Sequence, residues 1–238
     1  MIKPNGNVNT WTNELVHLMT QGGVKQTSTS HRYQSTARQP ASESEFNRRL
    51  RRAGVGERQI RLIDELFTKS GVVDSPKSWL DSYEEIKTRI GMFRSDSTIE
   101  IVLGPRGTGK TTMASLLIAW HAWWDRTCQY VTASEFLRDV IESFDAGLDP
   151  RPKCEKCRLL VIDEFHRAPP TDHSIRTLEA LVDKRYANLL DTVIVSNDTE
   201  QAFADRAGKS ITSRATQIGK ITVVRGHNFR KREERCSP

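Results

Sequence analysis

Residues 104–111 read Gly-Pro-Arg-Gly-Thr-Gly-Lys-Thr, a complete GxxxxGK(S/T) phosphate-binding loop. Residues 98–103, Thr-Ile-Glu-Ile-Val-Leu, precede it and are typical of a β-strand, whereas residues 112–124 are largely apolar and contain neither Gly nor Pro. The pattern therefore predicts a strand, a glycine-rich turn and a helix in succession. Such an arrangement directs backbone N–H groups and the positive end of a helix dipole toward an anion.

The residue types in this loop indicate a nucleoside triphosphate with Mg²⁺ as the ligand. Glycine lets the backbone turn inward around the phosphates, the Lys110 ammonium would reach the β- and γ-phosphates, and the Thr111 hydroxyl would hold the metal. A turn that binds no ligand is the plainer reading, but the flanking strand and helix argue against it. The residues predicted to bind the nucleotide are Gly104, Pro105, Arg106, Gly107, Thr108, Gly109, Lys110, Thr111 and Thr112.

The composition favours an intracellular protein that can bury a core of its own. The chain has 238 residues, 37 % of them hydrophobic, and a formal net charge of +6. No apolar run approaches the roughly 20 residues that span a bilayer, and the N-terminal residues lack the apolar stretch of a signal peptide. We therefore expect a cytoplasmic protein without membrane association. The positive charge is compatible with a nucleic-acid partner.

The chain is predicted to have two parts. We interpret residues 1–74 as an N-terminal partner-binding and linker segment, partly helical and partly disordered, and residues 75–238 as the main domain. The apolar residues within 11–18 have helical spacing, which suits either a helix that docks on a partner or a tail segment. Basic clusters at 48–52 and 230–235 either contact nucleic acid or form solvated faces.

Short apolar runs alternate with helical patterns along the main domain. Strands are predicted at 98–103, 129–132, 159–162, 192–195 and 221–224, and helices at 45–52, 57–69, 76–93, 112–124, 134–144, 175–186, 199–207 and 211–217. Five strands joined by helical crossovers predict an α/β fold with a five-stranded parallel sheet and helices on both faces.

Polar side chains follow two of the predicted strands. Asp163 and Glu164 end one apolar run, and Asn197 ends another. Because the carboxyl ends of parallel strands face the ligand crevice, we expect Asp163 to hold Mg²⁺ together with Thr111. Glu164 is interpreted as the group that polarises the attacking water, and Asn197 as the group that orients it. For each, a turn residue at a strand end is the alternative.

Two arginines are candidates for stabilising charge on a transferred phosphoryl group. Arg214 lies on the helix predicted at 211–217, and Arg230 follows the last predicted strand. An arginine supplied by a neighbouring subunit stabilises the transition state of phosphoryl transfer. Spacing alone does not distinguish such a residue from a surface arginine.

Cys154 and Cys157 form a CxxC pair without a second ligand pair at zinc-site spacing. We interpret both as reduced thiols in a loop rather than as a metal or redox site. Their role, if they have one, stays open.

Taken in order, these motifs resemble the DnaC/IstB branch of the AAA+ ATPases, which includes helicase loaders of bacteria and phages and the ATPase partners of transposases. The resemblance covers about residues 75–232. The segments that carry it are 104–114, 159–164, 181–186, 192–197, 211–214 and 226–230.

The resemblance implies a P-loop AAA+ core that binds ATP and Mg²⁺. It also implies that Glu164 supports hydrolysis, that Asn197 is the sensor-1 residue, that Arg214 is an arginine finger reaching the ATP of a neighbouring subunit, and that Arg230 is the sensor-2 arginine acting in its own subunit. Subunits would then assemble through ATP-bridged interfaces.

The function implied is that of a replication protein that loads or remodels a replicative helicase on DNA, with single-stranded DNA expected. Hydrolysis is expected to be slow and stimulated by DNA or by the partner. The alternative within the family is an IstB-like transposition ATPase that regulates a transposase. The chain has Ser210 where loaders often carry another arginine, and residues 165–170 replace the usual turn after the acidic pair. The choice between helicase and transposase therefore stays open.

Two other classes are weighed against this interpretation. A small-molecule kinase would need an acceptor site and a mobile lid, and the pair Asp163 and Glu164 with Asn197 argues against it. A DNA-binding scaffold with a degenerate nucleotide site is disfavoured by the intact Lys110.

Overall fold

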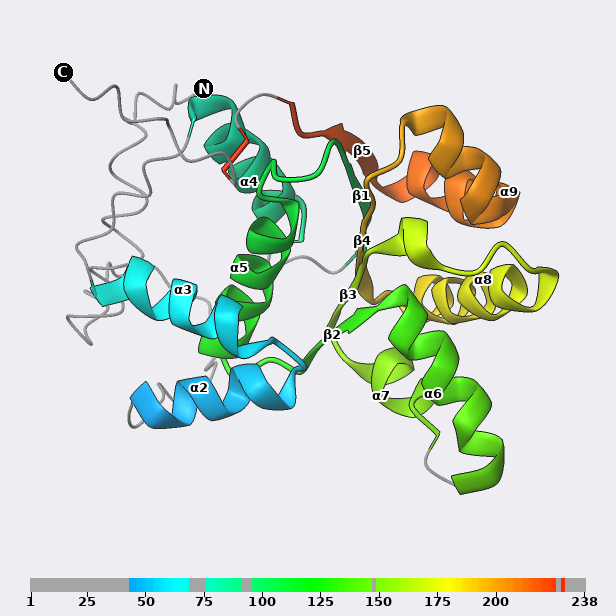
Figure 1. Ribbon diagram of the computed structural model, residues 1–238, viewed down its shortest axis with the longest axis horizontal. Helices are drawn as coiled ribbons and strands as arrows, with labels where there is room; N and C mark the ends of the chain where they lie inside the picture. The colour runs from blue at the N-terminus through cyan, green and yellow to red at the C-terminus, as the bar shows by residue number, and fades with distance from the viewer. Residues whose placement is uncertain (1–42, 69–75, 91–95, 147–148, 226–227, 230–238) are drawn as a thin grey trace, which may run out of the picture.

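The computed structural model describes residues 43–68, 76–90, 96–146, 149–225 and 228–229 (Figure 1). The helical pattern expected within 11–18 and the basic cluster at 230–235 lie outside these ranges.

The described residues form one five-stranded sheet in which every neighbouring pair is parallel. The strand order is β2-β3-β4-β1-β5. The strands are β1 (Ile99–Leu103), β2 (Cys128–Thr132), β3 (Leu159–Asp163), β4 (Asp191–Val195) and β5 (Lys220–Val223). The register places Ile101 opposite Ile194 on one side and Ile221 on the other. The prediction of a five-stranded parallel sheet is confirmed.

Helices cover both faces of the sheet, as the sequence predicts (Figure 1). One face carries α2 (Glu43–Arg52), α3 (Glu57–Thr68), α4 (Lys77–Arg89) and α5 (Lys110–Trp123). The other carries α6 (Ala133–Ala146), α7 (Arg151–Lys156), α8 (Asp172–Ala187) and α9 (Glu200–Ile218), with the short 3₁₀ helix η1 (Phe165–Arg167). The central strands are buried on both sides, which explains why they read as continuous apolar runs.

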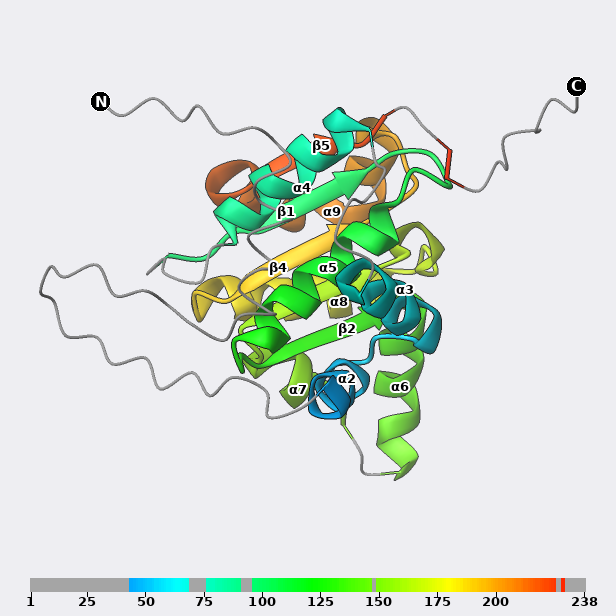
Figure 2. The ribbon, with the colours of Figure 1, turned by 90° about the vertical axis from the view of Figure 1, so that its left-hand side faces the viewer.

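The helices α2 and α3 pack on α5, on the face that also carries α4, as Figure 2 shows. Phe46 of α2 meets Trp123 of α5 edge to face, with ring centroids 5.6 Å apart. The Tyr130 N–H of β2 donates to the Ala53 carbonyl at 2.6 Å, so the end of α2 is bonded to the edge strand. The Arg-rich stretch at 48–52 is therefore held against the sheet. That residues 1–74 bind a partner stays a prediction.

The structure corrects the expectation that the CxxC pair lies in a loop. Cys154 lies in the short helix α7, Cys157 follows it directly, and both are buried. The guanidinium of Arg185, on α8, donates to both cysteine carbonyls at 2.5 and 2.9 Å and has no exposed surface. A buried arginine from a distant helix thus stabilises α7, and the local sequence carries no sign of it. Burial raises the pKa of the Cys154 thiol to about 12.

Two further features place the helices around the sheet. The two helices predicted at 199–207 and 211–217 form α9, whose backbone is non-helical at Gly208 (φ 77°, ψ 168°). A side chain there would meet Glu179 of α8, because the two helices approach closely at this point. On the other face, Arg89 donates twice to the buried Glu100 of β1, at 2.8 Å each. Among the helices of the described ranges, none combines the length and apolarity that crossing a bilayer requires.

Candidate nucleotide-binding site

The predicted phosphate loop connects the carboxyl end of β1 to the amino end of α5. Gly109 is the residue before the helix and has a left-handed backbone (φ 82°). A β-carbon there would lie 2.7 Å from Nε1 of Trp79 and 3.1 Å from the ring of Phe229, so only glycine fits. The loop is thus a tight turn ending at a helix N-terminus, which is the geometry that binds phosphate groups.

Lys110 begins α5 and is 5 % exposed. Its ammonium donates to the carbonyls of Gly104 and Pro105 at 2.7 and 2.8 Å. The cation is therefore held against the backbone of the same loop that presents the glycines. Within the predicted nucleotide-binding set, Pro105 and Arg106 are exposed, while Thr108 is buried and bonds Pro105 O. Thr112 lies in the first turn of α5 and is half-buried.

The two predicted metal-binding residues meet in the structure. The Thr111 hydroxyl donates to Asp163 Oδ2 at 2.8 Å, although 52 positions separate them in the chain. Asp163 ends β3 and is 3 % exposed. A hydroxyl and a carboxylate at the phosphate loop are the few protein ligands with which Mg²⁺ is held when phosphates supply the rest. The donor set therefore fits Mg²⁺ bound with a nucleotide.

Tyr130 of β2 is a site residue that the sequence analysis missed. Its hydroxyl donates to Asp163 Oδ2 at 2.6 Å. Burial, together with the Asp163 carboxylate, raises the pKa of Tyr130, so the phenol stays protonated and acts as a donor. The contact arises because β2 pairs with β3, with Tyr130 opposite Val161. An aromatic residue in a predicted strand gives no sign of its neighbouring strand.

Glu164, the residue after Asp163, adopts a left-handed backbone with φ 51°. Its N–H donates to Asp163 Oδ1 at 2.6 Å. The Glu164 carboxylate forms an ion pair with Arg167 at 3.0 Å, and both side chains are substantially exposed (37 % and 54 %). The candidate base is thus adjacent to the candidate metal ligand and held by a surface arginine that the sequence analysis did not assign to the site.

Asn197 lies just beyond β4 and contacts η1. The side-chain nitrogen of Asn197 lies 3.0 Å from Nε2 of His166. The backbone N–H of Asn197 donates to Nδ1 of the same ring at 3.4 Å. Burial lowers the pKa of His166, which favours the neutral ring. In the sequence, residues 165–170 stand out only as a departure from the family pattern. Instead, His166 links the end of β4 to the turn that carries Glu164.

Aromatic side chains of α4 and the C-terminal residues lie against the phosphate loop. Trp79 stacks on Tyr83 with ring centroids 6.0 Å apart and meets Phe229 edge to face at 6.3 Å. The Phe229 N–H donates to Gly107 O at 3.0 Å. Residues before β1 and after β5 therefore support the loop from outside the sheet.

Of the two candidate arginines, the structure describes only Arg214. Arg214, on α9, bonds Asp183 of α8 and the Ser210 hydroxyl, and its guanidinium lies 5.1 Å from the centroid of the Tyr186 ring. It is thus tied to its own subunit by three side chains, with 26 % of its side chain exposed. Arg230 lies outside the described residues.

The sequence that forms this site matches a known family. The AAA domain family matches residues 96–222, which is more than half of the chain. The chain belongs to this family. The match begins before β1 and ends within β5, so it includes the phosphate loop, the Asp163 turn and Asn197. None of the curated proteins compared with the sequence matches it.

Solved structures of replication proteins share the fold. The DnaC helicase loader aligns with a TM-score of 0.55 and 16 % identity, covering 63 % of this chain and 92 % of that one. DnaI aligns with a TM-score of 0.54 and 17 % identity, covering 67 % and 87 %. DnaA bound to AMPPCP and single-stranded DNA aligns with a TM-score of 0.53 and 16 % identity, covering 66 % and 49 %. This chain thus spans less than half the length of the two AMPPCP-bound DnaA chains it matches but most of the DnaC and DnaI chains. At these identities the likeness concerns the fold.

Proposed function

We propose that this protein is a Mg²⁺-dependent ATPase that acts in DNA replication as a helicase loader. The observation that carries the nucleotide part is the bond from Thr111 to Asp163 at 2.8 Å, which joins the phosphate loop to the acidic end of β3. Membership of the AAA family and the fold shared with DnaC and DnaI support the replication part.

The chain's own residues divide the work of binding and hydrolysis. The loop N–H groups and the Lys110 ammonium would bind the phosphates of ATP, and Thr111 with Asp163 would hold Mg²⁺. When bound, the metal neutralises charge on the phosphoryl oxygens. Glu164 accepts the proton of the attacking water, and Asn197 orients that water, with its amide positioned by His166.

Hydrolysis is tested by two substitutions that separate chemistry from binding. We expect Glu164→Gln to lower the steady-state rate by at least about 100-fold while ATP affinity is retained, because only the general base is lost. Lys110→Ala should abolish ATP binding itself. Glu142→Gln, an exposed carboxylate of α6, is the matched control and should leave both unchanged. A Glu164→Gln variant that hydrolyses ATP at the wild-type rate would remove the assignment of the base.

Assembly through shared ATP sites is the second part of the proposal. Arg214 would leave Asp183 and reach the nucleotide of a neighbouring subunit, where a guanidinium stabilises the transferring phosphoryl group. We expect Arg214→Ala to lose activity alone and to regain part of it when mixed with Lys110→Ala subunits, because each mutant supplies what the other lacks. If Arg214→Ala hydrolyses ATP as fast as the wild type, Arg214 does not act on the nucleotide of a neighbouring subunit.

The partner is tested with the full chain. We expect immobilised full-length protein with ATP to retain a purified hexameric replicative helicase, and Lys110→Ala to retain less of it if ATP controls the interaction. Retention of a transposase and not of the helicase would instead assign the chain to transposition.

A further inference from the structure

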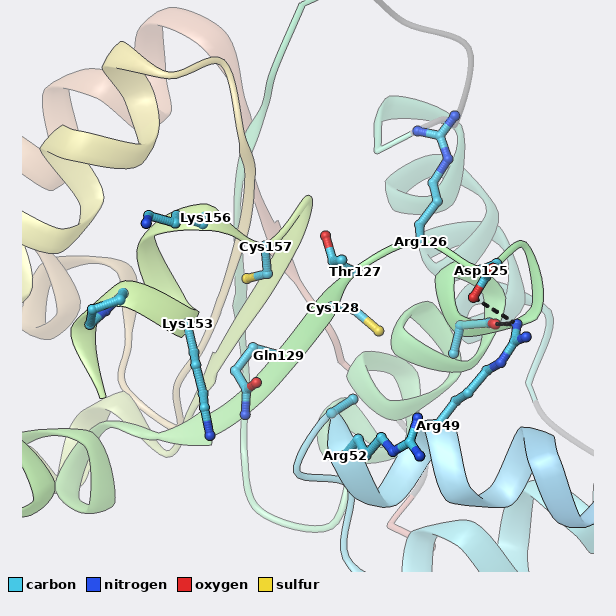
Figure 3. A pocket seen from close by; sticks show the side chains of 13 residues that line it. Arg49, Arg52, Asp125, Arg126, Thr127, Cys128, Gln129, Lys153, Lys156 and Cys157 are labelled. Atoms are coloured by element: carbon cyan, nitrogen blue, oxygen red, sulfur yellow. Dashed lines mark hydrogen bonds and ion pairs between the residues drawn. The ribbon is translucent and has the colours of Figure 1, made fainter. Parts of the chain in front are cut away.

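A basic pocket lies at the opposite end of the sheet from the phosphate loop. It opens beside the amino end of the edge strand β2 and has a volume of about 420 Å³. Its walls are α2, the turn between α5 and β2, and α7 (Figure 3). The phosphate loop follows the carboxyl end of β1, so a strand length of five residues, roughly 16 Å, separates the two regions. The pocket is therefore distinct from the nucleotide site.

Cations outnumber anions in the lining of this pocket. Its lining includes five Lys and Arg residues and one carboxylate, that of Asp125. Arg49 pairs with Asp125 at 3.2 Å and with Glu45 at 3.0 Å, which uses up the nearby negative charge. Arg52 on α2 and Lys153 on α7 lie on opposite walls and are both exposed, with Gln129 of β2 between them in Figure 3. No ion pair involves either of these two cations within the described residues.

The remaining cations raise the positive potential at this edge. Arg126, in the turn before β2, extends away from Arg49 and Arg52 in Figure 3 and so belongs to the rim. Burial and the charge of Arg158 lower the pKa of Arg126, which is the direction expected where positive charges gather. His121, at the end of α5, reports the same environment: burial, then Arg126 and Arg158, lower its pKa to about 3.

The pocket is built on backbone contacts rather than on loose side chains. The bond from Tyr130 N–H to Ala53 O fixes α2 to β2. The Arg158 N–H donates to Thr127 O at 2.9 Å, which fixes the turn before β2 to the start of β3. The backbones of the two walls that carry Arg52 and Lys153 are therefore held together, so binding an anion between them requires ordering of side chains only.

The two terminal segments of this chain carry no net negative charge that would complement the pocket. Residues 1–42 contain four Lys or Arg and one Glu, and residues 230–238 contain four Lys or Arg and two Glu. Both segments are therefore basic. A ligand that satisfies cations on two facing walls carries several negative charges and comes from another molecule.

We propose that this pocket binds the phosphodiester backbone of a nucleic acid, with Arg52 and Lys153 each contacting a phosphate. The inference rests on the proposed role in DNA replication, which implies a DNA partner, and adds the place where that DNA binds. A phosphate chain suits cations on two walls because its charges repeat along the strand, and the chain's net charge of +6 favours the encounter. DNA held here would leave the nucleotide edge of the sheet free for ATP.

The test measures binding of fluorescein-labelled dT25, and of a 25-base-pair duplex, to the full-length protein across a salt series. We expect Arg52→Ala/Lys153→Ala to make the slope of log K against log salt for dT25 shallower by about 1.4, since each lost phosphate contact removes about 0.7. At about 0.1 M salt, that difference corresponds to roughly 25-fold weaker binding. Whichever of the two probes binds more tightly identifies the strandedness.

Matched variants distinguish the loss of the pocket cations from a general loss of positive charge. Arg138→Ala/Lys209→Ala removes one Arg and one Lys from exposed positions on α6 and α9 that do not line the pocket, and should keep the wild-type slope. Exchanging the two cations, Arg52→Lys/Lys153→Arg, should also keep it. If Arg52→Ala/Lys153→Ala shows the same affinity and salt slope as Arg138→Ala/Lys209→Ala, the inference is overturned and the proposed function stays intact. A wild-type protein that hydrolyses ATP but binds neither probe overturns both the inference and the DNA partner.

Discussion

Replacing Glu100 with Ala is expected to lower the free energy of unfolding by about 3 kcal/mol. Glu100 lies in β1 and has no exposed surface. It accepts two bonds from Arg89 at 2.8 Å and one from the Thr98 hydroxyl at 2.7 Å. Its removal leaves a largely buried guanidinium without its main counter-ion, a change that typically destabilises a protein by about 3–5 kcal/mol. The Arg89 side chain is 21 % exposed and also lies 3.7 Å from Glu85, so we expect the lower end of that range.

Urea unfolding followed by far-UV circular dichroism measures the effect. With a denaturant slope of about 2 kcal/mol per molar, the midpoint should fall by roughly 1.5 M while the slope itself is unchanged. Glu85→Ala is the matched control, because it removes another carboxylate beside the same arginine, from a side chain that is 53 % exposed. Glu85 also pairs with Lys220 at 3.0 Å. Since each exposed ion pair contributes about 0–1 kcal/mol, the midpoint of this control should shift by less than about 1 M. Equal shifts for the two variants would refute the reasoning that burial sets the magnitude.

Three further outcomes are expected. Burial lowers the pKa of His121 to about 3, so between pH 6.5 and 3 the unfolded chain binds a proton that the folded chain does not. As the pH is lowered through this window, the free energy of unfolding should decrease by up to about 1.4 kcal/mol per pH unit. Urea unfolding of His121→Leu at pH 5 and 7 should show a smaller difference in this free energy than the wild type does. Tyr130→Phe removes the donor to Asp163, and should raise the Mg²⁺ concentration that gives half-maximal hydrolysis by about tenfold, as loss of a partner of a metal ligand does; an unchanged Mg²⁺ titration would count against that contact. Arg167→Ala frees Glu164 from an exposed ion pair worth about 0.2–1 kcal/mol, so steady-state ATP hydrolysis should rise by at most about fivefold, and a fall in rate would mean that Arg167 itself contacts the phosphates.

The phosphate loop and the strands were predictable from the sequence because their sequence patterns are local. A glycine spacing followed by Lys110 and Thr111 specifies a turn and a helix start over eight residues. The strands buried on both faces appear as short apolar runs, and their number and parallel direction follow from the helices between them. The meeting of Thr111 with Asp163 was also predictable, because the phosphate loop follows the carboxyl end of β1 and Asp163 ends the parallel strand β3.

The contacts that complete the site were not readable in this way. Tyr130 reaches Asp163 only because β2 pairs with β3, and strand order depends on how the crossovers pack. The contact of His166 with Asn197 depends on the turn after β3, where Glu164 takes a left-handed backbone that few non-glycine residues adopt. The helix formed around Cys154 is stabilised by a buried arginine from a distant helix, so local propensity predicts a loop instead.

The sequence by itself therefore determined the chemistry that this protein carries: a phosphate loop, an acidic strand end and a parallel sheet to align them. These features are encoded in residue types over a few positions. The tertiary structure alone decided other contacts, such as Tyr130 with Asp163 and the placement of Arg52 opposite Lys153 across the basic pocket. The physical reason is that such contacts join residues far apart in the chain. Their geometry depends on strand order and helix docking, which result from the packing of the whole core rather than from any one segment.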